Sequence, residues 1–168
     1  IVRQLFQGAH HEASVAATMM RADFDIEFED ESDSSRKHPE FIATHHASKT
    51  RIAVEAKSIH RKGIMGFDDG NPPPTVETAN AHKIAAQVCG QVEKALQKAN
   101  DLPFYIFVEL NLPPDVALAV APSLFDEFKA ILPQIDGGVD LNGASVGKAM
   151  NLLTVTNWPL QIEGTEYS

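Results

Sequence analysis

An acid and a base stand one residue apart near the end of an apolar run in the stretch RIAVEAKSIH, residues 51–60. They are Glu55 and Lys57. Alternate residues of a strand point to the same face, so these two side chains should share a face while Ile52 and Val54 pack into the core on the other. The pattern predicts a buried strand that presents two opposite charges at its end.

A second acid, Glu40, opens an earlier stretch, PEFIATHH, which also has the pattern of a strand. If the short ASKT connection pairs the two strands, Glu40 lies opposite Glu55 and Lys57. Two carboxylates and the carbonyl of Ala56 would suit Mg²⁺ or Mn²⁺, since hard cations of this kind prefer oxygen ligands. Lys57 would then hold an attacking water or offset charge on a phosphate. The chemistry indicated is metal-assisted phosphoryl hydrolysis.

Simpler interpretations of these residues remain open. Glu55 and Lys57 would also suit a solvated strand end with a same-face ion pair, which contributes little to stability. Glu40 alone would suit an exposed strand start. The agreement of all three positions favours a site.

The segment PEFIATHHASKTRIAVEAKS, residues 39–58, resembles the PD-(D/E)xK signature of the restriction-endonuclease-like nucleases. Pro39-Glu40 matches the family's Pro-acid pair, with glutamate where aspartate is usual, and Glu55-Ala56-Lys57 matches its acid-x-lysine triplet. The resemblance extends over roughly residues 3–112. It implies an αβββαβ core and a Mg²⁺- or Mn²⁺-dependent endonuclease acting on DNA. The extra methylene of Glu40 implies a shifted metal geometry.

The same resemblance adds residues on two predicted helices. Many members carry a glutamate on the first helix that joins the site, and Glu12 is the match, with surface exposure as the alternative. Some members carry a glutamine on the helix after the lysine. Gln91 fits this position and Gln87 lies at the edge of the same face, with burial and backbone hydrogen bonding as the alternative. Glu12 interrupts an apolar stripe formed by Leu5, Ala9, Ala16 and Met19.

Hydrophobic periodicity predicts an α/β protein with a mixed central sheet flanked by helices. Three consecutive strands with short connections favour an antiparallel meander. The long Pro-containing stretch 59–80 predicts a loop that shapes access to the site, and Ser123 is a candidate cap of the third helix. The expected helices cover 3–21, 81–99 and 121–132, and the expected strands cover 24–31, 39–46, 51–58, 102–112 and 150–158.

Composition predicts one globular domain over residues 1–168, with 43% hydrophobic and 22% charged residues. Because the first residue is Ile1 and not Met, a fragment of a longer protein is an alternative. A single cysteine, Cys89, excludes an internal disulfide, favours a cytoplasmic protein and fits a buried apolar position. No apolar run is long enough to suggest a membrane partner.

The formal net charge of −9 argues against a protein that coats DNA non-specifically. It does not exclude a metal-dependent nuclease, whose site must itself be acidic. Flanking domains outside this chain could supply a basic DNA-binding surface, and a homodimer is a further possible partner. Besides the nuclease, two hypotheses stay open: the same fold kept as a catalytically inactive interaction or structural module, and an enzyme of this fold with an unusual substrate.

Overall fold

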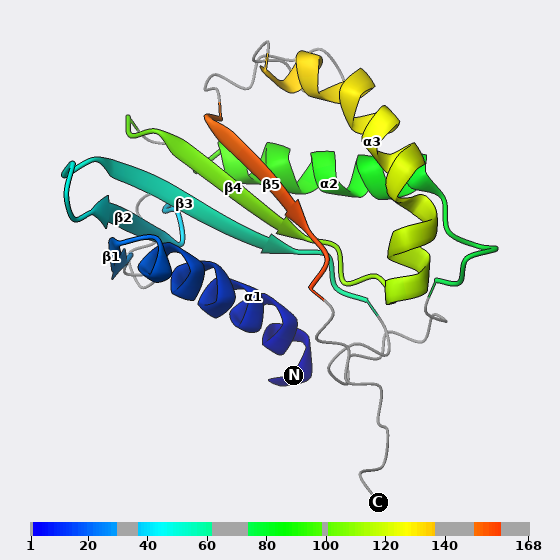
Figure 1. Cartoon of the computed structure of the whole chain (residues 1–168), viewed down its shortest axis with the longest axis horizontal. Coiled ribbons are helices and arrows are strands. Elements are labelled where there is room, and N and C mark those ends of the chain that lie inside the picture. The colour runs from blue at the N-terminus through cyan, green and yellow to red at the C-terminus, as the bar shows by residue number, and fades with distance from the viewer. Residues whose placement is uncertain (1, 30–36, 62–73, 99–100, 137–149, 159–168) are drawn as a thin grey trace, which may run out of the picture.

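The computed structural model describes residues 2–29, 37–61, 74–98, 101–136 and 150–158. The predicted order of elements is confirmed, from an N-terminal helix through three strands to alternating helices and strands (Figure 1). The elements are α1 (Val2–Arg21), β1 (Phe24–Phe28), β2 (Phe41–His45), β3 (Arg51–Ser58), α2 (Ala81–Leu96), β4 (Phe104–Glu109), α3 (Pro114–Asp136) and β5 (Leu152–Thr156).

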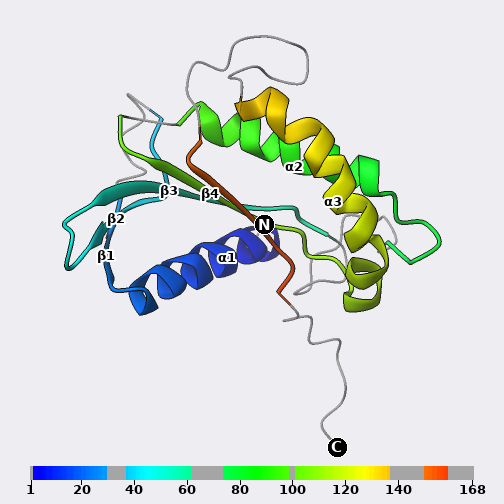
Figure 2. The same ribbon diagram turned by 45° about the horizontal axis from the view of Figure 1, so that its top comes forward.

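The strands form one mixed sheet in the order β1-β2-β3-β4-β5. The first three strands are an antiparallel meander, as the short connections predict, whereas β3, β4 and β5 run parallel. The parallel pairs need crossover connections, which α2 and α3 supply on the same face of the sheet (Figure 2). The α/β fold with a mixed sheet and flanking helices is therefore confirmed.

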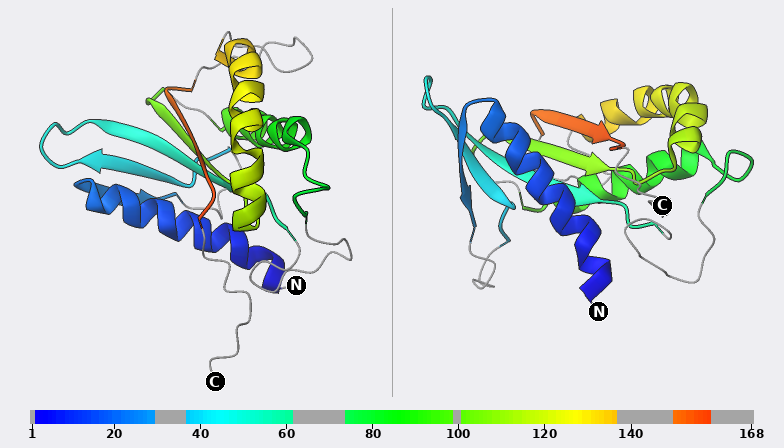
Figure 3. Two further views of the ribbon diagram at one scale, coloured as in Figure 1. Left: turned by 45° about the vertical axis from the view of Figure 1, so that its right-hand side comes forward. Right: turned by 60° about the horizontal axis from the view of Figure 1, so that its bottom comes forward.

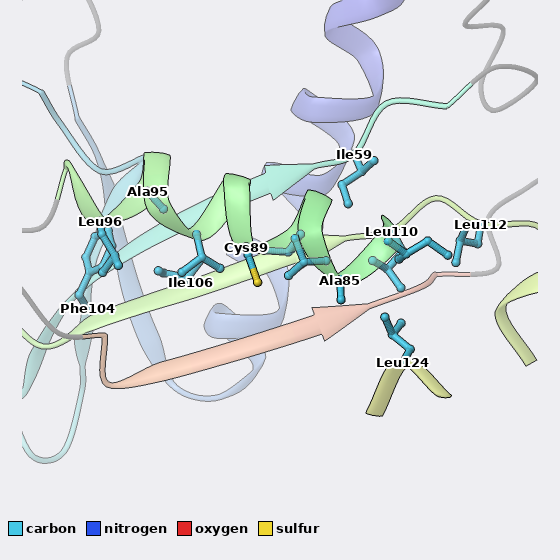
Figure 4. Close-up of a cluster of buried hydrophobic side chains, with 14 of the residues drawn as sticks. Ile59, Ala85, Cys89, Ala95, Leu96, Phe104, Ile106, Leu110, Leu112 and Leu124 are labelled. Atoms are coloured by element: carbon cyan, nitrogen blue, oxygen red, sulfur yellow. The ribbon is translucent and has the colours of Figure 1, made fainter. Parts of the chain in front are cut away.

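The helices cover opposite faces of the sheet (Figure 3). Val15, Ala16 and Met19 of α1 pack on Val54 and its same-face neighbours. On the other face, α2 contributes buried side chains that meet β3 and β4, and α3 packs beside it (Figure 4). Cys89 belongs to this second cluster and is 1% exposed, so its predicted burial is confirmed. Because α1 and α2 lie on different faces, the end of β3 has a helix on either side.

The third helix differs from the prediction. It begins at Pro114, whereas the sequence pattern places its start at residue 121. A proline is favourable in the first helical turn, because it has no amide hydrogen that needs a partner there. Pro122 suggests a start but lies inside the helix, where a proline causes a bend, and α3 changes direction along its length in Figure 1. Ser123 is therefore mid-helical and is not a cap.

The buried face of α1 also differs from the expected stripe. Ala9 is exposed, while the polar residues Gln7 and His11 are each only 2% exposed. Gln7 pairs with the backbone of Arg61 through its amide, and His11 Nε2 lies 3.4 Å from the carbonyl of Phe107. These hydrogen bonds let polar side chains occupy positions that an apolar pattern does not predict.

Two further expectations concern the long loop after β3 and the possibility of a membrane span. Residues 62–73 of the predicted loop 59–80 lie outside the described part of the chain, so its role stays a prediction. Among the helices that the structure describes, none combines the length and the apolar character that crossing a bilayer requires.

Candidate functional site

Glu40, directly before β2, lies beside Glu55 of β3, as predicted. Phe41 pairs with Val54, and the amide of Glu40 donates to the carbonyl of Val54 at 3.0 Å. The position before Phe41 therefore lies beside the position after Val54. Antiparallel pairing with β2 reaches no further than this point, whereas β3 continues to Ser58. Two carboxylates thus meet where the meander opens.

Lys57 joins both carboxylates. Its Nζ lies 3.0 Å from Oε1 of Glu40 and also forms an ion pair with Oε1 of Glu55. Strand alternation explains the meeting, since Glu55 and Lys57 share the face of β3 that is turned toward α2. The predicted convergence of three charged groups is present in the structure. Glu55 is 0% exposed, which excludes the solvated strand-end interpretation.

A second ammonium group reaches the same carboxylates, and the sequence pattern did not single it out. Lys98 follows the end of α2, and its Nζ lies 2.8 Å from Oε1 of Glu55 and 3.2 Å from Oε1 of Glu40. Its distance from Gln91 is seven residues, or about two helical turns, which was the available signal. The four side chains Glu40, Glu55, Lys57 and Lys98 are called the charge quartet below.

One carboxylate oxygen of the quartet, Oε2 of Glu55, has neither a hydrogen bond nor an ion pair among the described residues. Both carboxylate oxygens of Glu55 are buried, and neither accepts a hydrogen bond from a described residue. Oε1 forms ion pairs with the two ammonium groups, whereas Oε2 has no partner among these residues. Burying a carboxylate oxygen without a partner is unfavourable. Such an atom in a native core points to a strained or functional position.

The pKa values follow from burial and from these contacts. Burial raises the pKa of Glu55 to about 7, against the attraction of Lys57 and with support from the nearby charge of Glu40. Burial acts the same way on Glu40, but Lys57 and then Lys98 more than offset it, so the pKa of Glu40 is lowered. Burial opposes the charge of Lys57, yet Glu55 and Glu40 raise its pKa to about 12. Lys57 therefore stays protonated at neutral pH.

A cleft of about 830 Å³ opens beside the quartet. Lys57 is the member of the quartet that lines it, so this side chain stands between the cleft and the two carboxylates. The walls of the cleft come from α1, from α2 and from the end of β3. Its lining residues are Gly8, Ala9, Glu12, Ala56, Lys57, Ser58, Ile59, His60, Gln87, Gly90, Gln91 and Lys94.

The candidate residues on the helices all reach this cleft, but not the carboxylates directly. Glu12 lines it from α1, and Gln91 and Gln87 line it from α2. Gln87 also accepts a hydrogen bond from the guanidinium of Arg61 at 3.1 Å, which fits a structural role. Within the described ranges, no three His, Cys, Asp or Glu side chains gather as a metal site. Glu12 is thus not a third direct neighbour of Glu40 and Glu55, and its predicted ligation through water stays a prediction.

A buried polar network fixes the end of β3, and the sequence pattern gave no indication of it. The amide of Asn111 donates to Oγ of Ser58 at 2.7 Å and to the carbonyl of Ile59 at 3.0 Å. Glu109 accepts from the hydroxyl of Thr156 and from the amide of Trp158. Its pKa is raised, chiefly by burial. This network holds the parallel strands together directly behind the cleft.

The donor set fits a hard divalent cation in part. The carboxylates of Glu40 and Glu55 lie side by side, and one Glu55 oxygen is unsatisfied. Val54 directs its carbonyl toward β2, so strand alternation directs the carbonyl of Ala56 to the same side, past the last paired residue. Oxygen donors in this arrangement suit Mg²⁺ or Mn²⁺. The two ammonium groups on the same oxygens, however, compete with a cation for them.

No family model, curated protein or solved structure matches this chain. The comparisons therefore assign no family. What can be said about function depends on the quartet, on the cleft beside it and on the fold that positions them.

Proposed function

We propose that the chain is a metal-dependent nuclease domain with a restriction-endonuclease-like core, hydrolysing phosphodiester bonds in DNA. The observation that carries this proposal is the meeting of Glu40, Glu55 and Lys57 at the end of β3, beside an open cleft. The order of elements, an antiparallel meander followed by a parallel strand after α2, also supports the resemblance.

Glu40, Glu55 and the Ala56 carbonyl would hold Mg²⁺ or Mn²⁺. When bound, such an ion polarises a phosphoryl oxygen and lowers the pKa of a water molecule. Glu55 would bind as the carboxylate, and its pKa of about 7 makes this form accessible near neutral pH. The ion would also provide the missing partner for the buried Glu55 oxygen.

Lys57 acts as a hydrogen-bond donor and a positive charge. With a pKa of about 12 it carries no free lone pair at neutral pH, so it does not accept the proton of the attacking water. It lines the cleft and contacts both carboxylates, so in this proposal its ammonium would act on both the metal ligands and the substrate. From there it can orient a water molecule or offset charge that develops on the phosphate.

Gln91 and Glu12 face the same space from opposite helices. Gln91 would donate its amide hydrogens to a phosphate oxygen, and Glu12 would hold a water molecule on the far side. Both roles require only that substrate enters the cleft, and neither requires direct contact with the carboxylates.

A plasmid-nicking assay with Mg²⁺ or Mn²⁺ tests the proposal. Lys57→Ala should lower the nicking rate by roughly two to three orders of magnitude, as expected for a group that stabilises developing charge. Lys83→Ala is the matched control, because Lys83 is an exposed lysine of α2 that does not line the cleft. Equal rates for wild type and Lys57→Ala would exclude the assigned role, and the absence of Mn²⁺ binding at millimolar concentration would exclude the enzyme.

A second function is favoured by one specific observation. In the quartet two ammonium groups already balance two carboxylates, as in a core that no longer needs a metal. The same fold would then serve as an inactive interaction or structural module. Isothermal titration with Mn²⁺ separates the two functions: the nuclease binds the ion in a way that Glu55→Gln abolishes, and the inactive module binds none.

A further inference from the structure

Lys98 occupies an unusual position for a surface lysine. It comes after the last residue of α2, and its amide donates to the carbonyl of Ala95 at 2.8 Å. This bond fixes the start of the side chain, and the four-carbon stem carries the ammonium back to Glu55 and Glu40. The side chain remains 27% exposed, while the side chain of its main partner Glu55 is 0% exposed. Lys98 thus reaches from solvent to a buried carboxylate.

The charges of the quartet balance without any ion. When both carboxylates are ionised, as metal binding requires, their two negative charges face two ammonium groups, so a divalent cation placed on the same oxygens would create an excess of positive charge. Like charges packed this closely repel each other strongly in a poorly solvated site. One cation therefore has to leave when a metal ion arrives.

The two lysines differ in how readily they can leave. Lys57 rises from the middle of the sheet, paired with Val108 in the ladder, and its side chain is 20% exposed, somewhat less than that of Lys98. Lys98 stands past a helix end, and it can withdraw its long stem into solvent without moving a strand. Lys98 is the member of the quartet that can be exchanged at the lower cost.

We propose that Lys98 is an exchangeable counter-cation that holds Glu40 and Glu55 together until a divalent metal ion displaces it. The proposal rests on the proposed function, in which these two carboxylates bind the ion. It implies that Lys98 lowers metal affinity and sets the ion concentration at which the site becomes loaded. Metal binding and release of Lys98 are then one event.

Titration calorimetry with Mn²⁺ alone tests this on the full chain. Lys98→Met keeps the length of the stem and removes the charge, so it should tighten Mn²⁺ binding by about tenfold or more, the effect of one close charge on a buried carboxylate. Lys98→Arg keeps the charge and should bind Mn²⁺ close to wild type. Lys83→Met is the matched control, because Lys83 is an exposed lysine of the same helix that does not line the cleft.

Thermal unfolding supplies a second measurement. Without metal, Lys98→Met should melt below wild type, since two carboxylates then share one ammonium, and Mn²⁺ should restore more of its stability than it adds to wild type. A structural lysine without competition would lower the melting temperature in the same way but would leave Mn²⁺ affinity unchanged. Affinity therefore distinguishes exchange from simple packing.

The outcomes separate this inference from the proposed function. Mn²⁺ binding that disappears in Glu55→Gln but is equal in wild type and Lys98→Met overturns the exchange and leaves the metal site standing. Tighter binding by Lys98→Met than by wild type, lost in Glu55→Gln, supports both the exchange and the site. Absence of binding in wild type and in Lys98→Met alike overturns both.

Discussion

Glu55 is the residue whose environment most strongly affects the chemistry of the site. It is fully buried, one of its oxygens lacks a partner, and burial raises its pKa to about 7. In the metal-free protein, ionising this group works against folding, because the charge is better solvated in the unfolded chain. A carboxyl that resists ionisation in a core and lies next to a cleft is typical of functional sites.

Glu55→Gln should stabilise the metal-free protein at neutral and higher pH. Between its usual pKa of 4.5 and the folded value of about 7, Glu55 binds more protons in the folded state than in the unfolded state. The contribution of Glu55 to the unfolding free energy of the wild type therefore falls as the pH rises through that range. The difference in unfolding free energy between the variant and wild type should therefore grow by up to about 3 kcal/mol from pH 4.5 to pH 7 and then level off. Urea titrations in EDTA across this range measure it, and a constant difference would contradict the raised pKa.

Glu40→Gln should show the opposite sign. The two ammonium groups lower the pKa of Glu40, so its charge stabilises the folded state above the unfolded pKa, and that stability is lost as the pH falls. The variant should be less stable than wild type at neutral pH and should converge with it in acid. The same urea titrations measure this difference. A gain in stability at pH 7 would show that burial, and not the lysines, dominates at this position.

The strand residues of the site could be predicted from the sequence, while the seven-residue spacing from Gln91 was too weak a signal to place Lys98. Strand alternation fixes the faces of Glu55 and Lys57 once the strand is recognised, and a short turn fixes Glu40 beside them. A lysine beyond a helix end has no such constraint, because chain direction and side-chain length leave many positions open. Gln7 and Asn111 were missed for a different reason: their burial depends on hydrogen bonds that sequence spacing does not reveal.

Two glycines show how the elements keep the cleft open. Gly8 of α1 and Gly90 of α2 both line it, although glycine within a helix costs stability relative to alanine. A Cβ at Gly90 would meet no atom within 4 Å, and a Cβ at Gly8 would come no closer than 3.8 Å to His60. Neither glycine is required by close packing, so the space in front of them is the more direct explanation.

Gly90→Ala should stabilise the protein by about 1 kcal/mol, since alanine is the better helix former and its methyl group enters open space. Gly90→Trp should narrow the cleft, so that it retains Mn²⁺ binding but loses plasmid nicking. Denaturant unfolding measures the first effect, and the nicking assay with titration calorimetry measures the second. If Gly90→Trp cut plasmid as fast as Gly90→Ala, this cleft would not be the substrate site.

At the level of elements, hydrophobic periodicity predicted the order of helices and strands better than it predicted their boundaries or their buried faces. The order of strands and helices follows from the apolar runs and from the turns between them. The start of α3 was misplaced because Pro122 has the signature of a helix start but is accommodated by a bend. Ala16 and Met19 are buried as expected, but the first half of α1 was misplaced, because Gln7 and His11 are buried there and Ala9 is exposed. Both errors come from tertiary contacts that compensate for a locally unfavourable residue.

The molecule as a whole combines an acidic balance with a small group of basic side chains at the site. Its net charge of −9 repels a nucleic-acid backbone, while Lys57 and Lys94 line the cleft. Arg61 is close by, but its guanidinium is already used by the carbonyl of Leu110 and by Gln87. Among the residues that the structure describes, few cations at this cleft are therefore free to contact phosphates, so DNA bound there, as the proposed function requires, should be held through few charges.

This charge distribution predicts a weak salt dependence of DNA binding. In EDTA, which removes the ion that the proposed hydrolysis requires, the logarithm of the association constant should fall with the logarithm of salt concentration with a slope of roughly −1 to −3, because each neutralised phosphate adds about −0.9. Lys94→Ala should weaken binding to all sequences alike and make the slope shallower by about one. Lys83→Ala, away from the cleft, should leave the slope unchanged. Fluorescence anisotropy with a labelled duplex measures all three proteins. A steep wild-type slope that Lys94→Ala does not alter would place the DNA on another surface, because only cations in contact with phosphates release counterions.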